Sequence, residues 1–464
     1  MSVTLSDLTI SGVSVGDGGE TPPASDPYWA NVSLLTETTN INGANNFTLL
    51  DSSSNNFTII NDGASVTQGT FGPVVSGASG YFPSRAQSVH VTTDNFSYST
   101  GDFTIEAWVY PTETFTGMAI FSQDGDSRVV GTRTGQFSID GGNNRLEYDY
   151  YTSSSSQPTT IVTTSAILPN TWTHVAISRS GTSVKMFING IAGYSDTIAI
   201  MYQGTCISGI GCVPMPTASK NFNGYISDLR VTNTAVYTSN FSVPTAPLTA
   251  ITGTKLLMSF DNAGIYDAAA KNDMFTKYDA QVSTTQAKFG TTSIKLDGTG
   301  DYVSMPSNTD LQIVGGDFTI ESWIYATSTS LQQMINQDDG ASTNQTFTVR
   351  MEANGALGFI YYTGVSRGSA ITRTTSNTIP LNTWTNIAVS RTGSTLKMFI
   401  NGVQGYSGTV TSMYQGSVPT TLGAFTNGAY GYNFNGYMQD VRITKGVGRY
   451  TTDFTPSAQP FPTN

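Results

Sequence analysis

The sequence predicts an all-β protein made of two tandem jelly-roll β-sandwiches behind an extended N-terminal arm. Three observations support this prediction: the composition, short segments of alternating apolar and polar residues, and an internal repeat. The 464 residues include 47 Gly, 23 Tyr and 23 Phe, while charged residues make up only 11% of the chain. Aromatic residues favour strands and glycine favours turns, whereas charged helix formers are scarce here.

The internal repeat defines the organisation of the chain. Three segments recur at an offset of 212 to 215 residues: 101–110 as 316–325, 170–195 as 382–407, and 223–232 as 435–444. The first pair is identical at eight of ten positions and the second at 17 of 26. We therefore expect two homologous lobes at 27–249 and 250–464, each the size of a single all-β domain.

Within each lobe, alternation with period two predicts short strands. In GDFTIEAWVY, Phe103 and Ile105 fall on one face of the strand, while Thr104 and Glu106 fall on the other. The sequence SVKMFING then predicts a strand followed by a hairpin turn, because Asn-Gly tolerates the positive φ of a type I′ turn. Many short strands with clear turn signals favour a double-sheet jelly roll in each lobe.

Residues 1–26 precede the first lobe and are predicted to form an arm or tether. The alternating segment VTLSDLTISGVSV can pair as one strand, and GDGGETPPASDP has the Gly/Pro/Ser composition of a linker. The segment lacks the basic, long apolar and small-residue regions of a signal peptide, and no run of 18 apolar residues occurs in the chain. We expect a protein made in a cytoplasm, without membrane insertion.

Four motifs occur in both lobes: GDFTIEAWVY or GDFTIESWIY, a W-x-H/N-V/I-A strand, an FING hairpin, and FNGYISDLRVT or FNGYMQDVRIT. Together they resemble the laminin-G-like jelly roll of the concanavalin A-like lectin/glucanase superfamily, and the resemblance covers nearly everything after residue 27. The second lobe adds the family's KFGTTSIKLDGTGDYVSMP segment with Asp297 and Asp301. The first lobe departs there, with Phe82 and Ala86 at the aligned positions.

The closing segments 230–248 and 442–462 resemble the tails of laminin-G-like modules in virion proteins of tailed phages. The resemblance implies a non-enzymatic virion structural protein on the particle exterior: a tail or head fibre component, or a capsid decoration protein, that could bind host surface glycans. The arm would contact other virion proteins by adding a strand to a partner's sheet edge. A homotrimer is expected by analogy with viral appendages. A bacterial surface glycan-binding adhesin and a glycoside hydrolase of the glucanase superfamily are the alternatives.

Charge and catalytic motifs narrow the functional classes. The net charge of −11 gives no electrostatic basis for binding nucleic acid. Glycoside hydrolysis needs two carboxylates flanking the bond, and the E-x-D-x-x-E run of the glucanase branch does not occur. Glu106 and Glu321 are single strand acids, which we expect to be hydrogen-bonded to backbone or to an Arg. His174 becomes Asn386 in the other lobe, which favours a packing role, so no catalytic residue is expected.

Calcium is the one cofactor that the sequence permits, because hard oxygen ligands are plentiful and laminin-G-like modules sometimes hold this ion. Asp297 and Asp301 are the leading candidates for ligands. Other candidates are Asp338 and Asp339 in the second lobe and Asp124 and Asp126 in the first. The alternative is that these residues are turn residues whose side chains cap their own backbone.

Tyrosine clusters are the candidate ligand-binding residues, since sugar binding uses aromatic platforms beside hydrogen-bonding groups. The candidates are Tyr148, Tyr150, Tyr361 and Tyr362. Adjacent tyrosines on a strand point to opposite faces, so we expect at least one of each pair to meet solvent or a partner. The alternative places these rings in the sandwich core. Cys206 and Cys212 share one loop of the first lobe and could form a local disulfide, although a cytosolic origin favours thiols.

Overall fold

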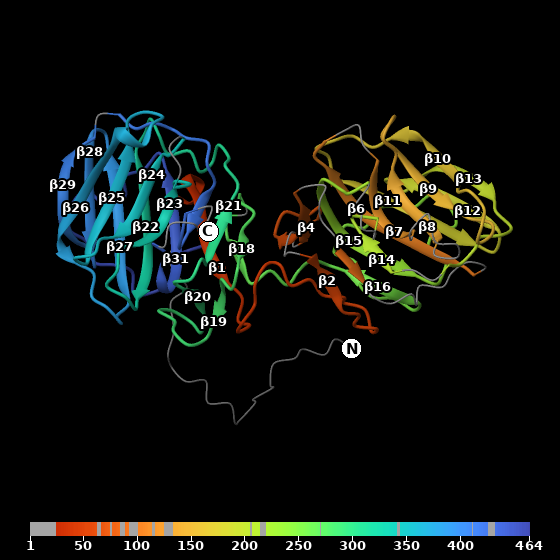
Figure 1. Ribbon diagram of the computed structural model, residues 1–464, viewed down its shortest axis with the longest axis horizontal. Coiled ribbons are helices and arrows are strands. Elements are labelled where there is room, and N and C mark those ends of the chain that lie inside the picture. Colours follow the sequence, from red (N-terminus) through yellow and green to blue (C-terminus); the bar gives the residue numbers. More distant parts are fainter. Residues whose placement is uncertain are drawn as a thin grey trace, which may run out of the picture.

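The computed structural model describes residues 25–62, 66–74, 77–83, 89–91, 101–113, 117–124, 133–204, 207–213, 220–269, 271–340, 344–410, 412–425 and 432–464. Four antiparallel sheets form two β-sandwich lobes that lie side by side (Figure 1), which confirms the predicted fold class. Residues 1–24 of the expected arm lie outside the described residues. Nowhere in the described ranges is a helix long and apolar enough to cross a membrane.

The first lobe contains an eight-stranded and a seven-stranded sheet. The eight-stranded sheet has the order β13-β12-β11-β6-β15-β4-β3 with β16 beside β15: β13 Ile191–Thr197, β12 Ser183–Ile188, β11 Thr173–Ser180, β6 Phe103–Pro111, β15 Gly224–Thr232, β4 Ser79–Phe82, β3 Thr67–Gly69 and β16 Thr254–Met258. The facing sheet has the order β10-β9-β8-β7-β14-β5-β2: β10 Thr159–Ala166, β9 Arg145–Tyr150, β8 Arg133–Ile139, β7 Met118–Asp124, β14 Ser208–Ile210, β5 Val89–Val91 and β2 Ile59–Asn61.

The second lobe repeats this pair of sheets. Its nine-stranded sheet has the order β17-β1-β31-β22-β27-β28-β29, with β20 beside β31 and β19 beside β20: β17 Ile265–Asp267, β1 Val32–Thr38, β31 Asn435–Lys445, β22 Phe318–Ala326, β27 Thr385–Thr392, β28 Thr395–Ile400, β29 Val403–Thr409, β20 Ser293–Asp297 and β19 Gln281–Ser283. The facing sheet has the order β18-β21-β30-β23-β24-β25-β26: β18 Phe275–Lys277, β21 Tyr302–Met305, β30 Thr420–Leu422, β23 Gln332–Gln337, β24 Phe347–Met351, β25 Ala356–Tyr362 and β26 Ala370–Thr378. Two short 3₁₀ turns, η1 Trp29–Asn31 and η3 Arg367–Ser369, also belong to this lobe.

The expected hairpins have the expected backbone. Asn189 and Gly190 join β12 to β13 with φ of 49° and 76°, and Asn401 and Gly402 join β28 to β29 with φ of 50° and 76°. Positive φ at both turn positions is the signature of a type I′ turn. The alternating apolar residues of the strands meet between the two sheets and form one core in each lobe.

The first strand of each sequence repeat lies in the opposite lobe. β1 pairs with β31 of the second lobe, with Leu35 opposite Arg442, and β16 pairs with β15 of the first lobe, with Leu257 opposite Arg230. Figure 1 shows red β1 among the green and blue strands of the second lobe. The lobes therefore exchange strands, and their sheets do not follow the expected division of the chain at 26/27 and 249/250.

Local sequence explains why either strand fits either lobe. VSLL in β1 and TKLL in β16 have the same pattern, and each strand is fixed by an aspartate of the other repeat. Leu35 N–H donates to Asp267 Oδ1 over 3.0 Å, and Leu257 N–H donates to Asp51 Oδ1 over 3.0 Å. Because the two sites are equivalent, the repeat in the sequence could not predict which lobe each strand would complete.

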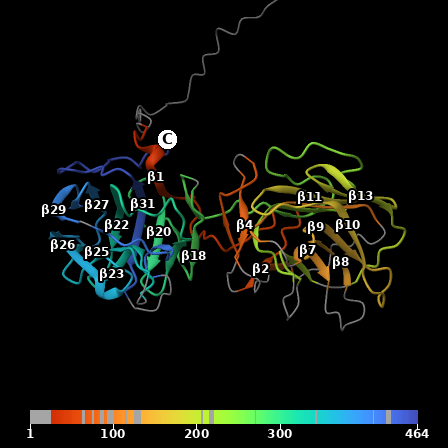
Figure 2. The same ribbon diagram turned by 90° about the horizontal axis from the view of Figure 1, so that it is seen from above.

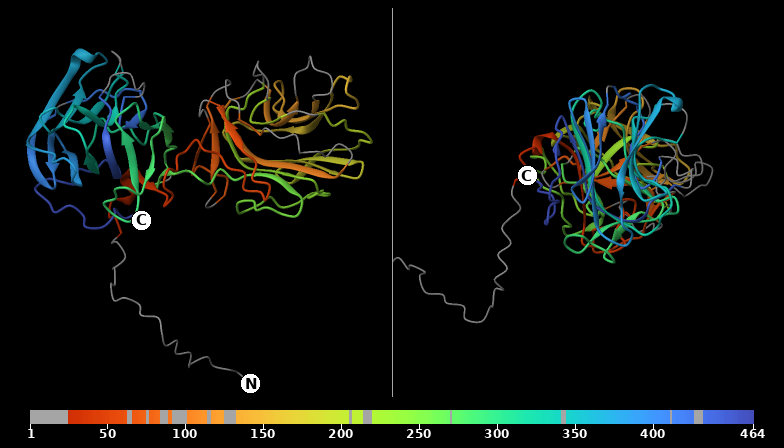
Figure 3. Two further views of the ribbon diagram at one scale, coloured as in Figure 1. Left: turned by 60° about the horizontal axis from the view of Figure 1, so that its bottom comes forward. Right: turned by 90° about the vertical axis from the view of Figure 1, so that its left-hand side faces the viewer.

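The two segments that cross between the lobes are bound to each other at Asn46, which is fully buried. Its Nδ2 donates to the Ile265 carbonyl over 2.7 Å, and its Oδ1 accepts from Ile265 N–H over 3.0 Å. The rings of Tyr81 and Phe275, from β4 and β18, also stack between the lobes at a centroid distance of 5.6 Å. Figures 2 and 3 show the crossing chains between the two sandwiches in further views.

The chain after β15 and after β31 covers the outer face of the larger sheet in each lobe. Tyr237 and Phe241 stack on each other at 3.6 Å and pack against the first lobe, as Tyr450 and Phe454 do at 3.6 Å in the second. The polar residues of the face beneath, among them Glu106, are fully buried. Any ligand site on an outer sheet face is therefore expected on the smaller sheet of a lobe.

Candidate functional site

A buried carboxylate network lies under the covering segment of the first lobe. Glu106 Oε1 accepts from Arg230 Nε over 2.9 Å and from its Nη2 over 2.6 Å, and Glu106 Oε2 accepts from the Tyr237 hydroxyl over 2.7 Å. His174 Nε2 lies 3.3 Å from Glu106 Oε2. Burial raises the pKa of Glu106, but the hydrogen bond from His174 and the Arg230 charge outweigh it and lower the pKa. The expectation of an Arg-bonded strand carboxylate is confirmed.

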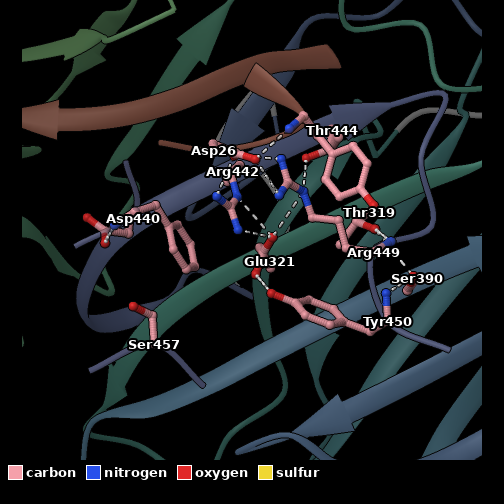
Figure 4. Close-up of polar contacts among 12 residues, drawn as sticks. Asp26, Thr319, Glu321, Ser390, Asp440, Arg442, Thr444, Arg449, Tyr450 and Ser457 are labelled. Carbon is pink, nitrogen blue, oxygen red and sulfur yellow. Dashed lines mark hydrogen bonds and ion pairs between the residues drawn. The ribbon is translucent and has the colours of Figure 1, made fainter. Parts of the chain in front are cut away.

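The second lobe contains the same network with two further residues (Figure 4). Glu321 accepts from Arg442 over 3.0 and 2.8 Å and from the Tyr450 hydroxyl over 2.7 Å. Asp26, from the segment that precedes β1, accepts from Arg442 Nη1 over 2.9 Å and from Arg449 Nη2 over 2.7 Å. Burial raises the pKa of Asp26, but the two arginines lower it overall. Removing one partner of such a buried pair would leave an uncompensated charge, so each carboxylate has a structural role here.

His174 is buried and has the packing role expected of it. Its ring meets Trp108 edge-on at 5.2 Å and Phe241 at 5.6 Å. The matching Asn386 in the second lobe is also buried. The second repeat therefore lacks the imidazole but keeps a buried residue at this position.

Three aspartates converge at one edge of the second lobe and form a candidate cation site. Carboxylate oxygens of Asp279, Asp297 and Asp301 all lie within 4.8 Å of one another. Asp301 Oδ2 accepts from Asp297 N–H over 2.8 Å, and burial raises the pKa of Asp301 to about 7. The hydrogen bond with Asp301 lowers the pKa of Asp279. The structure thus brings the two predicted ligands together and adds Asp279, a hard-oxygen donor set that fits calcium.

The other candidates in the second lobe, Asp338 and Asp339, do not join this cluster. Asp338 accepts from Gly340 N–H over 2.8 Å, as the turn interpretation expects, and from the Tyr362 hydroxyl over 2.7 Å. Asp126 and the side chain of Asp124 lie outside the described residues. Sequence reasoning missed Asp279 because the TKYDA turn between β18 and β19 carries no family motif.

The candidate tyrosines are buried, which corrects the expectation that one of each pair meets solvent. Tyr148, Tyr150 and Tyr361 point into the cores, with exposed fractions of 1%, 9% and 2%. Tyr362 is also only 2% exposed, although it faces the outer side of its sheet. Adjacent strand residues do point to opposite faces, but the Tyr362 side chain is covered on the outer face as well. Cys212 is buried and its thiol donates to the Val89 carbonyl over 3.4 Å; Cys206 lies outside the described residues.

Tyr362 lines a cavity of about 240 Å³ on the outer face of the smaller sheet of the second lobe, which we call the outer-sheet pocket. Its walls are Gln333, Asp338, Thr348, Arg350, Ile360, Tyr362, Arg367, Ala370, Phe425 and Tyr432. Arg367 Nη2 contacts Asp338 Oδ1 at 3.2 Å, and its guanidinium lies 5.7 Å from the Phe425 ring centroid. Tyr432 is 46% exposed at the rim.

One buried atom of the outer-sheet pocket has no hydrogen-bond partner in the described part of the chain. Gln333 is 1% exposed, and its Oε1 accepts no hydrogen bond from the described residues. A buried acceptor without a donor costs about 1–3 kcal/mol, so a hydroxyl bound in the pocket could recover this energy. The sequence signals neither Gln333 nor Tyr432, since both lie outside the motifs.

The corresponding face of the first lobe is occupied by charged side chains. Lys220 Nζ lies 2.9 Å from Glu147 Oε1 and 3.6 Å from Asp149 Oδ2. Ser138 donates to the same Glu147 oxygen over 3.0 Å. Glu147 and Asp149 are thus held by one ammonium group.

Comparisons with known proteins agree with this fold. The family model described as the concanavalin A-like lectin/glucanases superfamily matches residues 84–239 and 297–447. No protein in the search of curated sequences matches the chain.

Three solved structures illustrate the likeness to known folds. The binding domain of Paraclostridial Mosquitocidal Protein 1 is 17% identical over 39% of this chain, with a TM-score of 0.33; the match spans about half (47%) of that domain's length. Domain 4 of AbnA, a GH43 extracellular arabinanase from Geobacillus stearothermophilus, solved with arabinotriose, is 17% identical over 39% of this chain and 86% of that one, with a TM-score of 0.31. Mouse laminin alpha1 domains LG4-5 are 11% identical over 76% and 85%, with a TM-score of 0.28.

Proposed function

Because the chain belongs to the concanavalin A-like lectin/glucanases superfamily, we propose that it is a non-enzymatic structural protein of a phage virion exterior that binds host surface saccharides. It would be made in the host cytoplasm and localise to the virion. Tail fibre, head fibre and capsid decoration are the forms that this role could take.

The outer-sheet pocket is the observation that carries saccharide binding. Tyr432 offers an exposed ring on which the C–H face of a sugar can stack. Gln333 Oε1 offers a buried acceptor for a sugar hydroxyl, and Arg367 and Asp338 add a charged donor and acceptor. An apolar rim above a polar floor suits a ring that is itself apolar on one face and hydroxylated at its edge.

The absence of enzymatic activity is supported by the bonding of the strand acids. Glu106 and Glu321 are fully buried and each is bound by an arginine. A general acid has to be protonated near neutral pH, whereas the environment of Glu106 favours its ionised form.

The virion role rests on the resemblance of the closing segments 230–248 and 442–462 to the tails of laminin-G-like modules in phage virion proteins. Asp26 N–H donates to the Asn464 carbonyl over 2.8 Å, so residue 26 and the C-terminus lie together on the second lobe. An arm that begins there would place the second lobe nearest the particle and the first lobe outward. The partners would be other virion proteins, in an assembly that we propose to be trimeric.

A glycan array of the full chain tests saccharide binding. We expect selective binding that falls at least tenfold in Tyr432→Ala, because the stacking platform is lost. Tyr278→Ala is the matched control, since Tyr278 is 63% exposed but does not line the outer-sheet pocket. Equal binding by both variants, or no saccharide bound by the wild type, would reject the proposal for this pocket.

Deletion of residues 2–24 tests the arm without removing Asp26. We expect a folded two-lobe protein that no longer joins the particle when it replaces the full chain during phage growth. Full occupancy of the truncated protein on particles would show that the arm is not the attachment. Light scattering of the full chain measures the oligomeric state.

A further inference from the structure

A second cavity lies between the two lobes, with a volume of about 360 Å³; we call it the interlobe cleft. The first lobe contributes Thr70, Phe71, Tyr110, Thr112, Asn170 and Tyr225, and the second contributes Lys271, Asn272, Asp273, Pro306 and Asn308. Its size is within the usual range of ligand sites, about 300–1,000 Å³. We propose that the interlobe cleft binds a neutral saccharide ring, independently of the outer-sheet pocket.

The walls of the cleft are fixed relative to each other. The Tyr225 hydroxyl of the first lobe donates to Asp273 Oδ2 of the second over 2.6 Å. Within the wall of the second lobe, Asn308 Nδ2 donates to Asn272 Oδ1 over 2.8 Å, and Asn272 Nδ2 donates to the Ser33 carbonyl of β1 over 2.6 Å. Together with the bound crossing segments at Asn46, these contacts preorganise the site, which lowers the entropic cost of binding.

One wall is an aromatic platform. Phe71 is 39% exposed, although its ring rests on three other rings. Its centroid lies 5.1 Å from Tyr110 and 4.7 Å from Tyr225, both edge-on, and 5.4 Å from Trp172. A supported phenyl ring that stays partly in water can stack on an apolar ligand face with little loss of side-chain freedom.

The opposite wall supplies hydrogen-bonding groups. Lys271 Nζ donates to the Val32 carbonyl over 2.6 Å, and an ammonium group has three donors, so two remain for a ligand. Asn308 also lines this wall and keeps one N–H beyond its bond to Asn272, whereas both N–H groups of Asn272 are bonded to the Ser33 carbonyl and to Asp267. An aromatic wall facing an ammonium group and one free amide N–H matches a sugar, with its C–H face on Phe71 and its hydroxyls toward Lys271 and Asn308.

The charges in the cleft distinguish a sugar from a cationic ligand. Aromatic clusters also bind quaternary ammonium groups, but the Lys271 ammonium would repel such a ligand. Asp273 cannot offset this repulsion well, because it already accepts from Tyr225 and burial raises its pKa. The cleft therefore disfavours a cationic ligand, whereas the hydroxyl oxygens of a neutral sugar can accept hydrogen bonds from the Lys271 ammonium group.

The second lobe contains an internal control for the platform. Tyr325, Trp384 and Tyr437 repeat Tyr110, Trp172 and Tyr225, with centroid distances of 5.7 and 6.0 Å from Tyr325. Within the described ranges, no ring packs on this second trio as Phe71 packs on the first. A variant there perturbs the same kind of aromatic cluster away from the cleft.

The experiment compares saccharide affinities of Phe71→Ala, Phe71→Trp and Tyr325→Ala in the full chain, by calorimetry with the neutral saccharides that bind on the array. We expect Phe71→Ala to weaken at least one saccharide by tenfold or more, while Phe71→Trp and Tyr325→Ala bind it within about twofold of the wild type. Phe71 is partly exposed, so its loss should leave the fold intact, which circular dichroism checks.

Tyr432→Ala separates this inference from the proposed function. A saccharide lost by Phe71→Ala and kept by Tyr432→Ala supports a site in the interlobe cleft. If every bound saccharide is lost by Tyr432→Ala and kept by Phe71→Ala, the cleft inference is wrong and the outer-sheet pocket stands. If binding is selective for quaternary ammonium compounds, or if the wild type binds no neutral saccharide, the inference is also overturned.

Discussion

The two lobes share a buried glutamate, arginine and tyrosine, but they complete this network from different parts of the chain. In the first lobe, the additional partner of Glu106 is His174, from the neighbouring strand β11. In the second lobe, Asn386 occupies that strand position, and the additional residues are Arg449 and Asp26. Asp26 and Arg442 are 416 residues apart in the sequence.

This difference shows that two copies of one fold can complete the same buried network with residues from a neighbouring strand or with residues from a distant part of the chain. The first network has one carboxylate and one arginine, whereas the second has two of each. The second lobe thereby binds the start of the described chain next to its end. A repeated domain can in this way bind the chain segment that precedes it without altering its fold.

The largest expected effect comes from removing the carboxylate of the simpler network. Glu106→Gln leaves the Arg230 guanidinium buried without a carboxylate, and breaking such a pair typically costs about 3–5 kcal/mol. Glu321→Gln should cost less, because Arg442 keeps Asp26 as a partner. Hydrogen exchange resolved by peptide would measure the loss of protection in each lobe.

The comparison would fail if both variants destabilised their lobes equally, since the second carboxylate would then contribute nothing. Glu113→Gln serves as a charge control, because Glu113 lies in the first lobe outside the Glu106 network.

The second prediction removes the long-range contact. Asp26→Asn leaves two buried arginines with one carboxylate, and we expect the second lobe to lose about 2–3 kcal/mol of stability, consistent with the loss of charged hydrogen bonds. Because the pKa of Asp26 is lowered, its contribution is present above the usual aspartate pKa and is lost as the pH falls.

Exchange protection of β1 is the direct measurement for this variant, with the first lobe as the internal control. Protection that falls equally in both lobes would contradict a local role for Asp26. Unchanged protection of β1 would show that its pairing with β31 is sufficient.

The sequence could predict the fold because its signals are local. Alternation at 103–110 and the Asn-Gly turns depend on neighbouring residues, and the repeat supplies the second copy. Strand exchange depends instead on two equivalent acceptor sites, at Asp51 and Asp267, which no local pattern distinguishes.

The candidate sites likewise contain some residues that are close in the sequence and others that only long-range pairing brings together. Asp297 and Asp301 are four residues apart across one turn, so their proximity could be predicted, whereas Asp279 joins them only through β18 pairing with β21. The exposure expected of the tyrosines was wrong because alternation predicts which face a side chain occupies, but not what covers that face. The outer-sheet pocket and the interlobe cleft combine segments distant in the sequence.

The third prediction concerns a feature that the lobes share. Asp228 and Asp440 are equivalent buried residues, and burial raises the pKa of each to about 7. An unfolded aspartate titrates near pH 4, so between about pH 4 and 7 the folded state holds more protons than the unfolded state. Stability should therefore fall as the pH rises, by about 1.4 kcal/mol per pH unit for each residue.

Asn variants remove this contribution while keeping the backbone, since the φ values of 49° and 52° suit Asn as well as Asp. The free energy of unfolding of Asp228→Asn minus that of the wild type should increase from pH 5.5 to pH 6.5, because only the wild type loses stability over this range. Asp440→Asn should show the same increase. A difference independent of pH would mean that these carboxyl groups are ionised throughout the range.

The smallest expected effect is calcium binding, which should distinguish the lobes because the cluster of Asp279, Asp297 and Asp301 belongs to the second. A divalent ion would favour the ionised form of Asp301 and offset the burial that raises its pKa to about 7. At a calcium concentration five times Kd, linkage gives about 1 kcal/mol of stabilisation. Asp301→Asn should abolish the gain, whereas Asp310→Asn, an exposed acid outside the cluster, should retain it. Thermal unfolding with and without calcium measures this stabilisation. A stabilisation that persists in Asp301→Asn would place the ion elsewhere. No stabilisation at millimolar calcium would mean that these aspartates are turn residues.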